Sequence, residues 1–271
     1  MPSLIDSHCH FDFSVFDGQR ATILSRCKAH QIQAIIVPAV CASSWQTLLS
    51  ICHDEPVLYP ALGLHPCFTH KHHIDDLKQL VRLCEQQSVC AIGEIGLDYF
   101  IKNTDRSMQH DYFAEQLDIA QQYQLPVLIH ARKSHHDILQ QLKQRPSLKG
   151  VIHAYSGSYE QAKEYLKMGF KLGFGGAYTY PKATRLRSLM TKLPIEAWVL
   201  ETDAPDMSPI GHQGETNSPL YITEIAQAFA CLLAYLPESQ RDFTQIMTQI
   251  EKNTLAIFPF LKLNNSKQSN V

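Results

Sequence analysis

The chain has 271 residues, which is long enough to bury one large hydrophobic core. A content of 45% hydrophobic and 18% charged residues excludes a largely disordered chain. With 24 basic against 26 acidic residues the net charge is −2, so no overall basic surface attracts nucleic acid, and any attraction for phosphate has to be local.

The sequence gives no indication of export or of membrane association. The N-terminal residues lack the basic and apolar regions of a signal peptide, and no run approaches the roughly 18 apolar residues of a membrane span. Eight cysteines lie mostly within apolar runs and form no CxxC pair, which is typical of reduced, buried thiols. We therefore expect a cytoplasmic protein that binds no membrane and needs no obligate protein partner. Because no extended apolar surface stripe is evident, we expect a monomer.

Short β-rich runs alternate with longer amphipathic segments along the whole chain. The predicted strands cover residues 4–10, 34–40, 57–64, 89–97, 126–131, 150–155, 171–176 and 198–202. The predicted helices between them cover residues 44–53, 74–87, 105–123, 136–143, 159–168 and 181–192. A polar loop rich in Pro and Gly follows at residues 203–219, and two further helices are predicted at 220–236 and 238–258.

This order of elements predicts an α/β fold. Strands that alternate with helices, without an antiparallel block, favour a parallel sheet, and eight repeats favour a closed (β/α)₈ TIM barrel. No Gly-x-Gly-x-x-Gly follows the first strand, which removes the main signature of a dinucleotide-binding fold. We predict one barrel domain over residues 1–263 and a disordered tail over residues 264–271.

Residues of metal-binding types occur where the predicted strands end. They are His8 and His10 on the first strand, Glu94 on the fourth, His130 on the fifth, His153 on the sixth and Asp203 after the eighth. A lone histidine is more often a hydrogen-bonded core or surface residue than a ligand. Six such residues on five strands favour a metal site instead, because the carboxyl ends of barrel strands meet where the active sites of this fold lie.

Six protein ligands are too many for one catalytic ion that keeps an open position, so two divalent ions sharing a carboxylate fit better. Glu94 is the expected bridge. His8, His10 and Asp203 would hold the first ion, since strand eight closes against strand one, and the imidazoles of the fifth and sixth strands would hold the second. This ligand set suits Zn²⁺, Mn²⁺, Co²⁺ or Mg²⁺, and the sequence does not choose among them.

Two carboxylates are candidates for orienting the ligands. Glu201 lies two residues before Asp203, and Asp6 lies two residues before His8, so each side chain points inward one layer deeper. Either carboxylate could orient a ligand imidazole, or it could satisfy buried backbone groups.

Two further side chains are candidates for substrate contact. Arg132, two residues beyond His130, could clamp a phosphate or form an ordinary loop salt bridge. His65 ends the third strand and is a candidate contact. Asp98 and Tyr99 could shape the pocket, without an assigned role. The histidine-rich segment at residues 67–73 is expected to be a solvated loop, and His70, His72 and His73 receive no role.

Several motifs together resemble those of the TatD-related hydrolases. They are Asp6-Ser-His-Cys-His, Gly63-Leu-His-Pro, Gly93-Glu-Ile-Gly-Leu-Asp, His130-Ala-Arg, His153-Ala-Tyr-Ser-Gly, Glu201-Thr-Asp-Ala-Pro and Asn253-Thr-Leu-Ala-Ile-Phe. They occur in order from residue 4 to residue 258, and within the family the chain is most similar to the YjjV-type branch. The resemblance implies a TIM-barrel hydrolase whose two-metal site is formed by the six residues listed above. It also implies deoxyribonuclease activity.

The leading hypothesis is therefore hydrolysis of an ester bond in a phosphodiester, DNA being the expected substrate, by a water that two metal ions activate. Asp203 would be both a ligand and the general base, while Arg132 and His65 would neutralise charge on the phosphoryl oxygens. Two alternatives stay open. One is an amidohydrolase-like enzyme that cleaves C–N or C–O bonds in a small molecule, and the other is a non-catalytic protein that binds metal or nucleic acid. The polarity of attack on DNA is not predicted.

Overall fold

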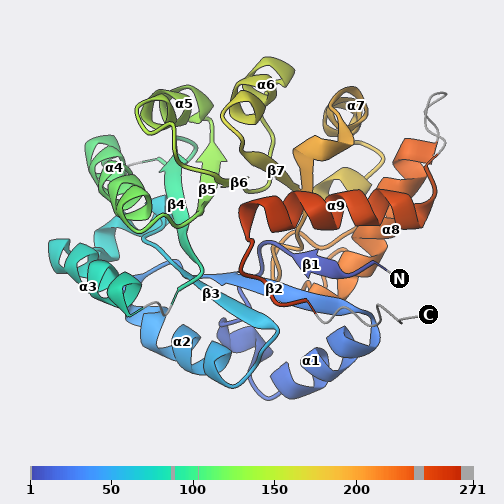
Figure 1. The fold of residues 1–271 in the computed structure, drawn as a ribbon, viewed down its shortest axis with the longest axis horizontal. Helices are drawn as coiled ribbons and strands as arrows, with labels where there is room; N and C mark the ends of the chain where they lie inside the picture. Colours follow the sequence, from blue (N-terminus) through green and yellow to red (C-terminus); the bar gives the residue numbers. More distant parts are fainter. Residues whose placement is uncertain (1, 87–88, 103, 235–240, 264–271) are drawn as a thin grey trace, which may run out of the picture.

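The computed structural model describes residues 2–86, 89–102, 104–234 and 241–263. Eight parallel strands form one sheet in sequence order, surrounded by helices as Figure 1 shows. The strands are β1 (Leu4–Asp6), β2 (Ile32–Pro38), β3 (Leu58–Leu62), β4 (Ala91–Asp98), β5 (Val127–Arg132), β6 (Gly150–Ile152), β7 (Lys171–Phe174) and β8 (Trp198–Leu200). The predicted (β/α)₈ barrel is confirmed, whereas the predicted tail at residues 264–271 lies outside the described residues.

The helices follow the strands as expected for a barrel. They are α1 (Arg20–Ala29), α2 (Trp45–His53), α3 (Ile74–Glu85), α4 (Arg106–Gln122), α5 (His135–Lys143), α6 (Tyr159–Lys167), α7 (Thr184–Lys192), α8 (Ile222–Ala234) and α9 (Phe243–Ile257). Among the described residues, no helix combines the length and the apolarity that a membrane crossing requires. All eight cysteines lie in the described part of the chain, and each is a free thiol.

The structure differs from the predicted elements in one helix and one loop. Helix α1 was not predicted, because its short apolar stripe, with three of ten residues buried, gives a weak periodic signal. The segment predicted as a solvated loop contains a 3₁₀ helix, η3 (Pro66–Lys71), and His72 behind it is buried. The ring atom Nε2 of His72 lies 2.9 Å from the carbonyl oxygen of His65, so this histidine helps to fix the loop after β3.

The barrel closes between β1 and β8 through hydrogen bonds just beyond the strands. The Ser7 N–H donates to the carbonyl oxygen of Leu200 at 2.9 Å. The buried Asp6 carboxylate accepts hydrogen bonds from the Thr202 N–H at 2.9 Å and from the Thr202 hydroxyl at 2.6 Å. These bonds hold together the two segments that carry His8, His10 and Asp203.

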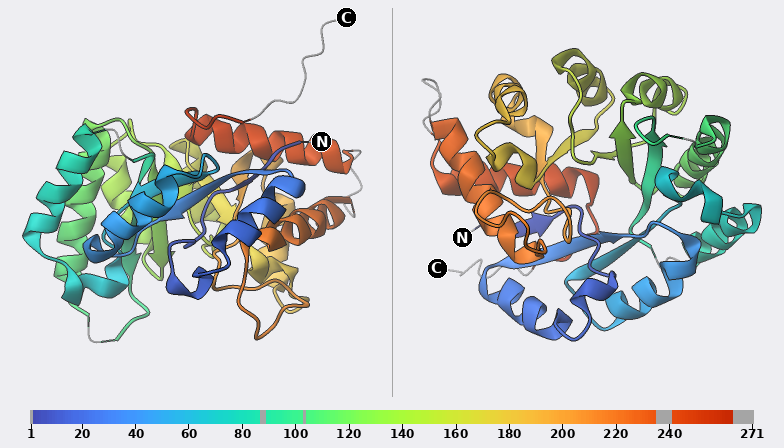
Figure 2. Two further views of the ribbon diagram at one scale, coloured as in Figure 1. Left: turned by 90° about the horizontal axis from the view of Figure 1, so that it is seen from below. Right: turned by 180° about the vertical axis from the view of Figure 1, so that it is seen from behind.

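Helix α9 fills the N-terminal end of the barrel. Ile257, Phe258 and Leu261 pack in one buried cluster with residues at the starts of the strands. The Asn253 side-chain amide donates to the carbonyl oxygens of Ile195 and Trp198, both at 2.8 Å, which anchors the helix beside β8. Figure 2 shows α9 across one end of the barrel and the loop after β8 at the other. The polar residues are therefore left to the C-terminal end of the strands.

Candidate metal centre

The six predicted ligands converge at the C-terminal end of the barrel. Glu94 lies within β4 and His130 within β5, whereas His8, His10, His153 and Asp203 lie beyond the ends of their strands. Strand β1 ends at Asp6, so the prediction that His8 and His10 close this strand was wrong. Their side chains nevertheless point to one place, since the two Nε2 atoms are 3.3 Å apart.

Four side chains make a compact set of ligand atoms, which we call the first group: His8, His10, Asp203 and one oxygen of Glu94. The His8 Nε2 atom lies 3.2 Å from Glu94 Oε2 and 3.8 Å from Asp203 Oδ1. The His10 Nε2 atom lies 3.5 Å and 3.8 Å from the same two oxygens. Ligands about 2.1 Å from a tetrahedral cation are about 3.4 Å from one another, so these residues fit a divalent metal ion.

A second group lies at the other oxygen of Glu94. The Glu94 Oε1 atom is 3.2 Å from His65 Nε2 and 3.0 Å from His130 Nδ1. The ligand atoms of His65, Cys67 and His130 lie within 4.8 Å of one another. We call these three residues the second group. The Glu94 carboxylate thus stands between two sets of potential ligands, one at each of its oxygens.

His153 belongs with the first group by position. Its Nε2 atom lies 3.4 Å from Asp203 Oδ1, and its ring stacks on that of His8 with a centroid distance of 3.6 Å. The sequence suggested that His153 and His130 share one ion. The structure instead brings His153 to His8 and Glu94, while His130 groups with His65 and Cys67.

The two predicted orienting carboxylates have different roles in the structure. Glu201 Oε2 lies 3.1 Å from His153 Nδ1, and Glu201 Oε1 accepts a hydrogen bond from the Ala154 N–H at 2.7 Å. A methyl group on Gly173 would lie 2.1 Å from Glu201 Oε2, so this carboxylate needs a glycine beside it. Asp6 contacts the main chain of His8, at 3.2 Å from its N–H, and not the ring. Asp6 therefore satisfies buried backbone groups and does not orient a ligand imidazole.

Sequence reasoning assigned no role to Asp98, which contacts the centre directly. Its Oδ2 atom lies 2.9 Å from His130 Nε2, while His130 Nδ1 faces Glu94. The arrangement parallels Glu201, His153 and Asp203, because each imidazole is placed between two carboxylates. Such outer carboxylates orient metal-binding imidazoles in many proteins. Side chains two residues apart on a strand point to the same side, so Asp98, four residues after Glu94, could have been assigned to the centre from the sequence.

Burial and the neighbouring carboxylates act in opposite directions on the pKa values of these imidazoles when no metal ion is present. Burial opposes charge on His130, but hydrogen bonds to Asp98 and Glu94 raise its pKa to about 9. Burial lowers the pKa of His65 to about 4, with Glu94 acting in the opposite direction. Burial also opposes ionisation of Glu94, yet the His65 and His8 rings hold its pKa well below the usual range. The centre therefore concentrates negative charge that protons or cations have to balance.

Asp203 is the more accessible of the two central carboxylates. Its side chain is 13% exposed, compared with 3% for Glu94. The backbone at Asp203 has φ 57°, in the left-handed region that Asp tolerates better than most residues. A hydrogen bond of 2.9 Å from the Asp203 N–H to the His8 carbonyl oxygen holds it there. The turn thus presents the carboxylate to the mouth of the barrel.

The two predicted substrate-contacting residues lie at different depths. His65 is buried against Glu94, within the centre itself. Arg132 is exposed at the end of β5, and its guanidinium carbon lies 3.8 Å from the centroid of the Phe100 ring. Arg132 is therefore at the rim of the mouth, and the structure shows no salt bridge to it among the described residues.

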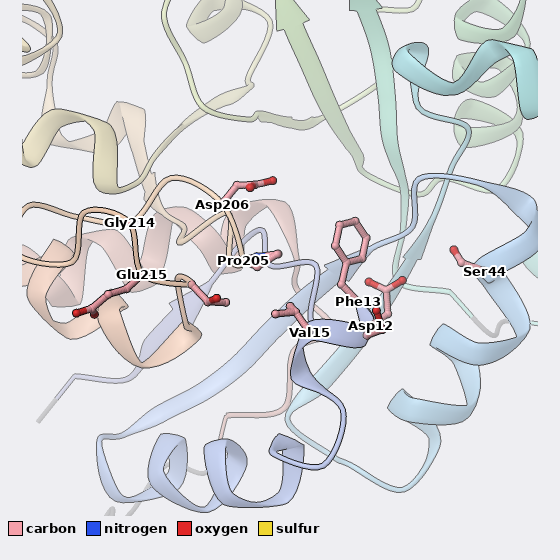
Figure 3. A pocket seen from close by; sticks show the side chains of 10 residues that line it. Asp12, Phe13, Val15, Ser44, Pro205, Asp206, Gly214 and Glu215 are labelled. Carbon is pink, nitrogen blue, oxygen red and sulfur yellow. The ribbon is translucent and has the colours of Figure 1, made fainter.

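A pocket of about 650 Å³ opens beside the first group. Figure 3 shows it between residues 12–15 and the loop after β8, which carries Pro205, Asp206 and Glu215. The ring of Phe13 in this pocket stacks on that of His10 with a centroid distance of 4.9 Å. The buried Asp12 also lines it, so the charged side chains of the pocket are acidic. This side of the mouth suits neutral or cationic groups better than phosphate.

A TIM barrel with imidazoles and carboxylates clustered at the C-terminal ends of its strands has the architecture of a metal-dependent hydrolase. The family model described as TatD related DNase matches residues 5–259, and the chain belongs to this family. The resemblance noted in the sequence motifs is thereby confirmed.

Individual relatives agree with this assignment. The chain is 38% identical to the uncharacterized metal-dependent hydrolase YjjV of Escherichia coli, over 94% of this chain and 97% of the relative. It is 37% identical to an uncharacterized metal-dependent hydrolase of Haemophilus influenzae, over 84% of this chain and 90% of the relative. The crystal structure of E. coli YjjV, a TatD homologue, matches with a TM-score of 0.88 and 36% identity, covering 94% and 98% of the two chains. The protein is a metal-dependent hydrolase.

Proposed function

We propose that this protein hydrolyses phosphodiester bonds in nucleic acid, DNA being the expected substrate, with two divalent cations bound in its centre. His8, His10, His153 and Asp203 would hold one cation and His130, with His65 beside it, the other, while Glu94 would bridge them. Divalent cations in such a site lower the pKa of water and offset the charge of the phosphoryl oxygens.

The observation that carries the proposal is the position of Glu94. Its Oε2 atom lies 3.2 Å from His8 Nε2, and its Oε1 atom lies 3.0 Å from His130 Nδ1. One carboxylate with imidazoles at both oxygens suits two cations that share a ligand. Pairs of cations about 3.5–4 Å apart recur in phosphatases and nucleases, where they act on both the attacking and the leaving oxygen. This geometry supports phosphodiester hydrolysis.

The residues around the cations would divide the remaining work. Asp203, whose side chain is 13% exposed, would accept the proton of the attacking water. Glu201 and Asp98 would keep the rings of His153 and His130 in place. Arg132 at the rim would bind a phosphate oxygen of the substrate through its planar guanidinium group.

The first experiment purifies the protein without chelator and measures bound metal and cleavage of single- and double-stranded oligonucleotides. We expect about two equivalents of metal per chain and cleavage that requires the metal. Two equivalents without cleavage of either oligonucleotide would contradict nuclease activity and favour an amidohydrolase-like reaction, tested with amides and lactones. Failure to bind Zn²⁺ or Mn²⁺ would contradict the metal centre itself.

Glu94→Ala is the sharpest variant for the bridging role. Removing the shared ligand should lower the metal content below one equivalent and reduce the cleavage rate by more than about 100-fold, beyond the effect of losing an outer carboxylate. Glu196→Ala is the matched control, because Glu196 is exposed just before β8 at the opposite end of the barrel. Full activity of Glu94→Ala would refute the bridge.

A further inference from the structure

The loops after β4 and β5 present an exposed aromatic ring next to two cations. Phe100 is 50% exposed, so its ring is accessible from solvent. The guanidinium carbon of Arg132 lies 3.8 Å from the centroid of its ring, and Lys133 Nζ lies 4.8 Å from it. Such cation–π contacts hold the charged groups of long, flexible side chains near one position. We call Phe100, Arg132 and Lys133 the aromatic clamp.

The clamp is connected to the metal centre through Asp98. The Phe100 N–H donates to Asp98 Oδ1 at 2.8 Å, and the other oxygen of Asp98 lies 2.9 Å from His130 Nε2. The Tyr99 N–H donates to the carbonyl oxygen of Arg132 at 2.9 Å, which ties the two loops together. The clamp is therefore held at a fixed place beside the second group.

Charge makes this side of the mouth different from the rest of the molecule. A further cation, Arg106, stacks over the ring of the neighbouring Tyr99 at 4.4 Å, and the exposed Lys102 follows two residues after Phe100 in the chain. The pocket on the other side of the centre is lined by Asp12, Asp206 and Glu215. Since the whole chain has a net charge of −2, attraction for a polyanion has to come from local basic groups, and the clamp is one such group beside the centre.

We propose that the aromatic clamp binds single-stranded nucleic acid and guides it to the centre, a proposal that rests on the proposed phosphodiesterase function. Bases stack on aromatic rings and on guanidinium planes only where they are unpaired, and neighbouring cations bind the phosphates of the same strand. A duplex hides the faces of its bases, so it could use the cations but not the ring. The clamp thus selects single strands over duplexes.

The test compares Phe100→Ala and Phe100→Trp with the wild-type holoenzyme on a 12-nucleotide single strand and on its duplex. For Phe100→Ala we expect KM on the single strand to rise about tenfold, because loss of one stacking side chain weakens binding to this extent. The kcat should fall much less, and Phe100→Trp should restore KM. Phe260→Ala is the matched control, since its ring is 39% exposed beside Tyr59 and Pro60, at the starts of the strands. Circular dichroism verifies that each variant is folded.

Lys133→Asn provides a second measurement that does not depend on the ring. Lys133 has φ 58°, a conformation that Asn tolerates. Loss of one phosphate contact should flatten the dependence of log KM on log salt concentration by about 0.7, the value for a single strand. An unchanged single-strand KM in Phe100→Ala, or a failure of Phe100→Trp to restore it, overturns the clamp while leaving nuclease activity intact. If the wild-type protein cleaves neither oligonucleotide, the proposed function itself fails.

Discussion

The two groups of the metal centre use similar residues in different surroundings. In the first group the side chains of His8 and His10 are 0% and 8% exposed, and His153 is stacked against His8. In the second group the His130 side chain is 19% exposed, and it lies under the basic loops rather than beside the acidic pocket. The imidazoles of the first group are thus more enclosed than His130, which is the most exposed imidazole of the second group and lies on the side that suits phosphate.

This difference predicts that cations bound in the two groups would differ in their exchange rates and in their access to substrate. A cation in the first group would be held by ligands that pack against one another, so it should exchange slowly. A cation in the second group would be nearer to solvent and to a substrate bound at the rim. Because Glu94 contacts both groups, loss of a ligand in one group should also weaken metal binding in the other.

The largest effect that tests this difference is expected from His10→Ala and His130→Ala. Each variant should lose about one equivalent of metal and reduce kcat by more than about 100-fold, because a ligand contributes more than an outer carboxylate does. The cation left in His130→Ala should resist dialysis against chelator longer than the one left in His10→Ala. Metal analysis at intervals during dialysis measures both rates. Equal rates would show that the two groups do not differ in exchange.

A smaller effect is expected from the two outer carboxylates. Glu201→Gln and Asp98→Asn keep the shape of each side chain and remove its charge, so each should weaken binding of one cation by about 10- to 100-fold. Glu201→Gln should affect the slowly exchanging cation and Asp98→Asn the other. Titration of the metal-free variants with Zn²⁺ against a competing chelator measures the two affinities. Loss of the same cation in both variants would contradict the assignment of these carboxylates to separate groups.

The sequence was sufficient to predict where the centre lies, but not which residues belong to each of its two groups. Repeated strand and helix patterns locate the carboxyl ends of the strands, and every predicted ligand lies near one of them. The division depends on features that no local pattern encodes. Ala154, directly after His153, has φ 42°, and the ring of His153 turns toward His8 instead of His130. The contact of His65 with Glu94 likewise depends on the path of the loop after β3.

The rim of the mouth was the least predictable part. Phe100 follows a buried strand in an apolar motif, and its sequence position alone favours burial. It is exposed because the Asp98 carboxylate accepts a hydrogen bond from the Phe100 N–H, and the chain turns away from the barrel there. Arg132 was expected at the mouth, but its stacking on Phe100 comes from the packing of two loops, which the order of residues does not reveal.

His135 in α5 shows how a buried imidazole behaves when its ring contacts tyrosines instead of carboxylates. It is as buried as His10, but its ring packs against Tyr155 and Tyr165, with Tyr165 Oη 3.2 Å from Nδ1. Burial, together with the positive charges of Arg185 and His130, lowers its pKa to about 4. His130, with a carboxylate at each ring nitrogen, has a pKa of about 9. A carboxylate at each ring nitrogen therefore raises the pKa of a buried imidazole, whereas burial without such partners lowers it.

This contrast predicts a small effect on stability with no loss of metal. A pKa near 4 in the folded state, against 6.5 in the unfolded state, means that below pH 6.5 the unfolded chain binds a proton that the folded chain excludes. The contribution of His135 to the free energy of unfolding is thus fully present above pH 6.5. It decreases toward pH 4, and about 2 kcal/mol is lost at pH 5. His135→Phe lacks this proton, so between pH 7.5 and 5 its free energy of unfolding in urea should fall about 2 kcal/mol less than that of the wild type. Equal falls in the two proteins would mean that His135 is not held neutral, and the rule drawn from the two groups would not extend beyond them.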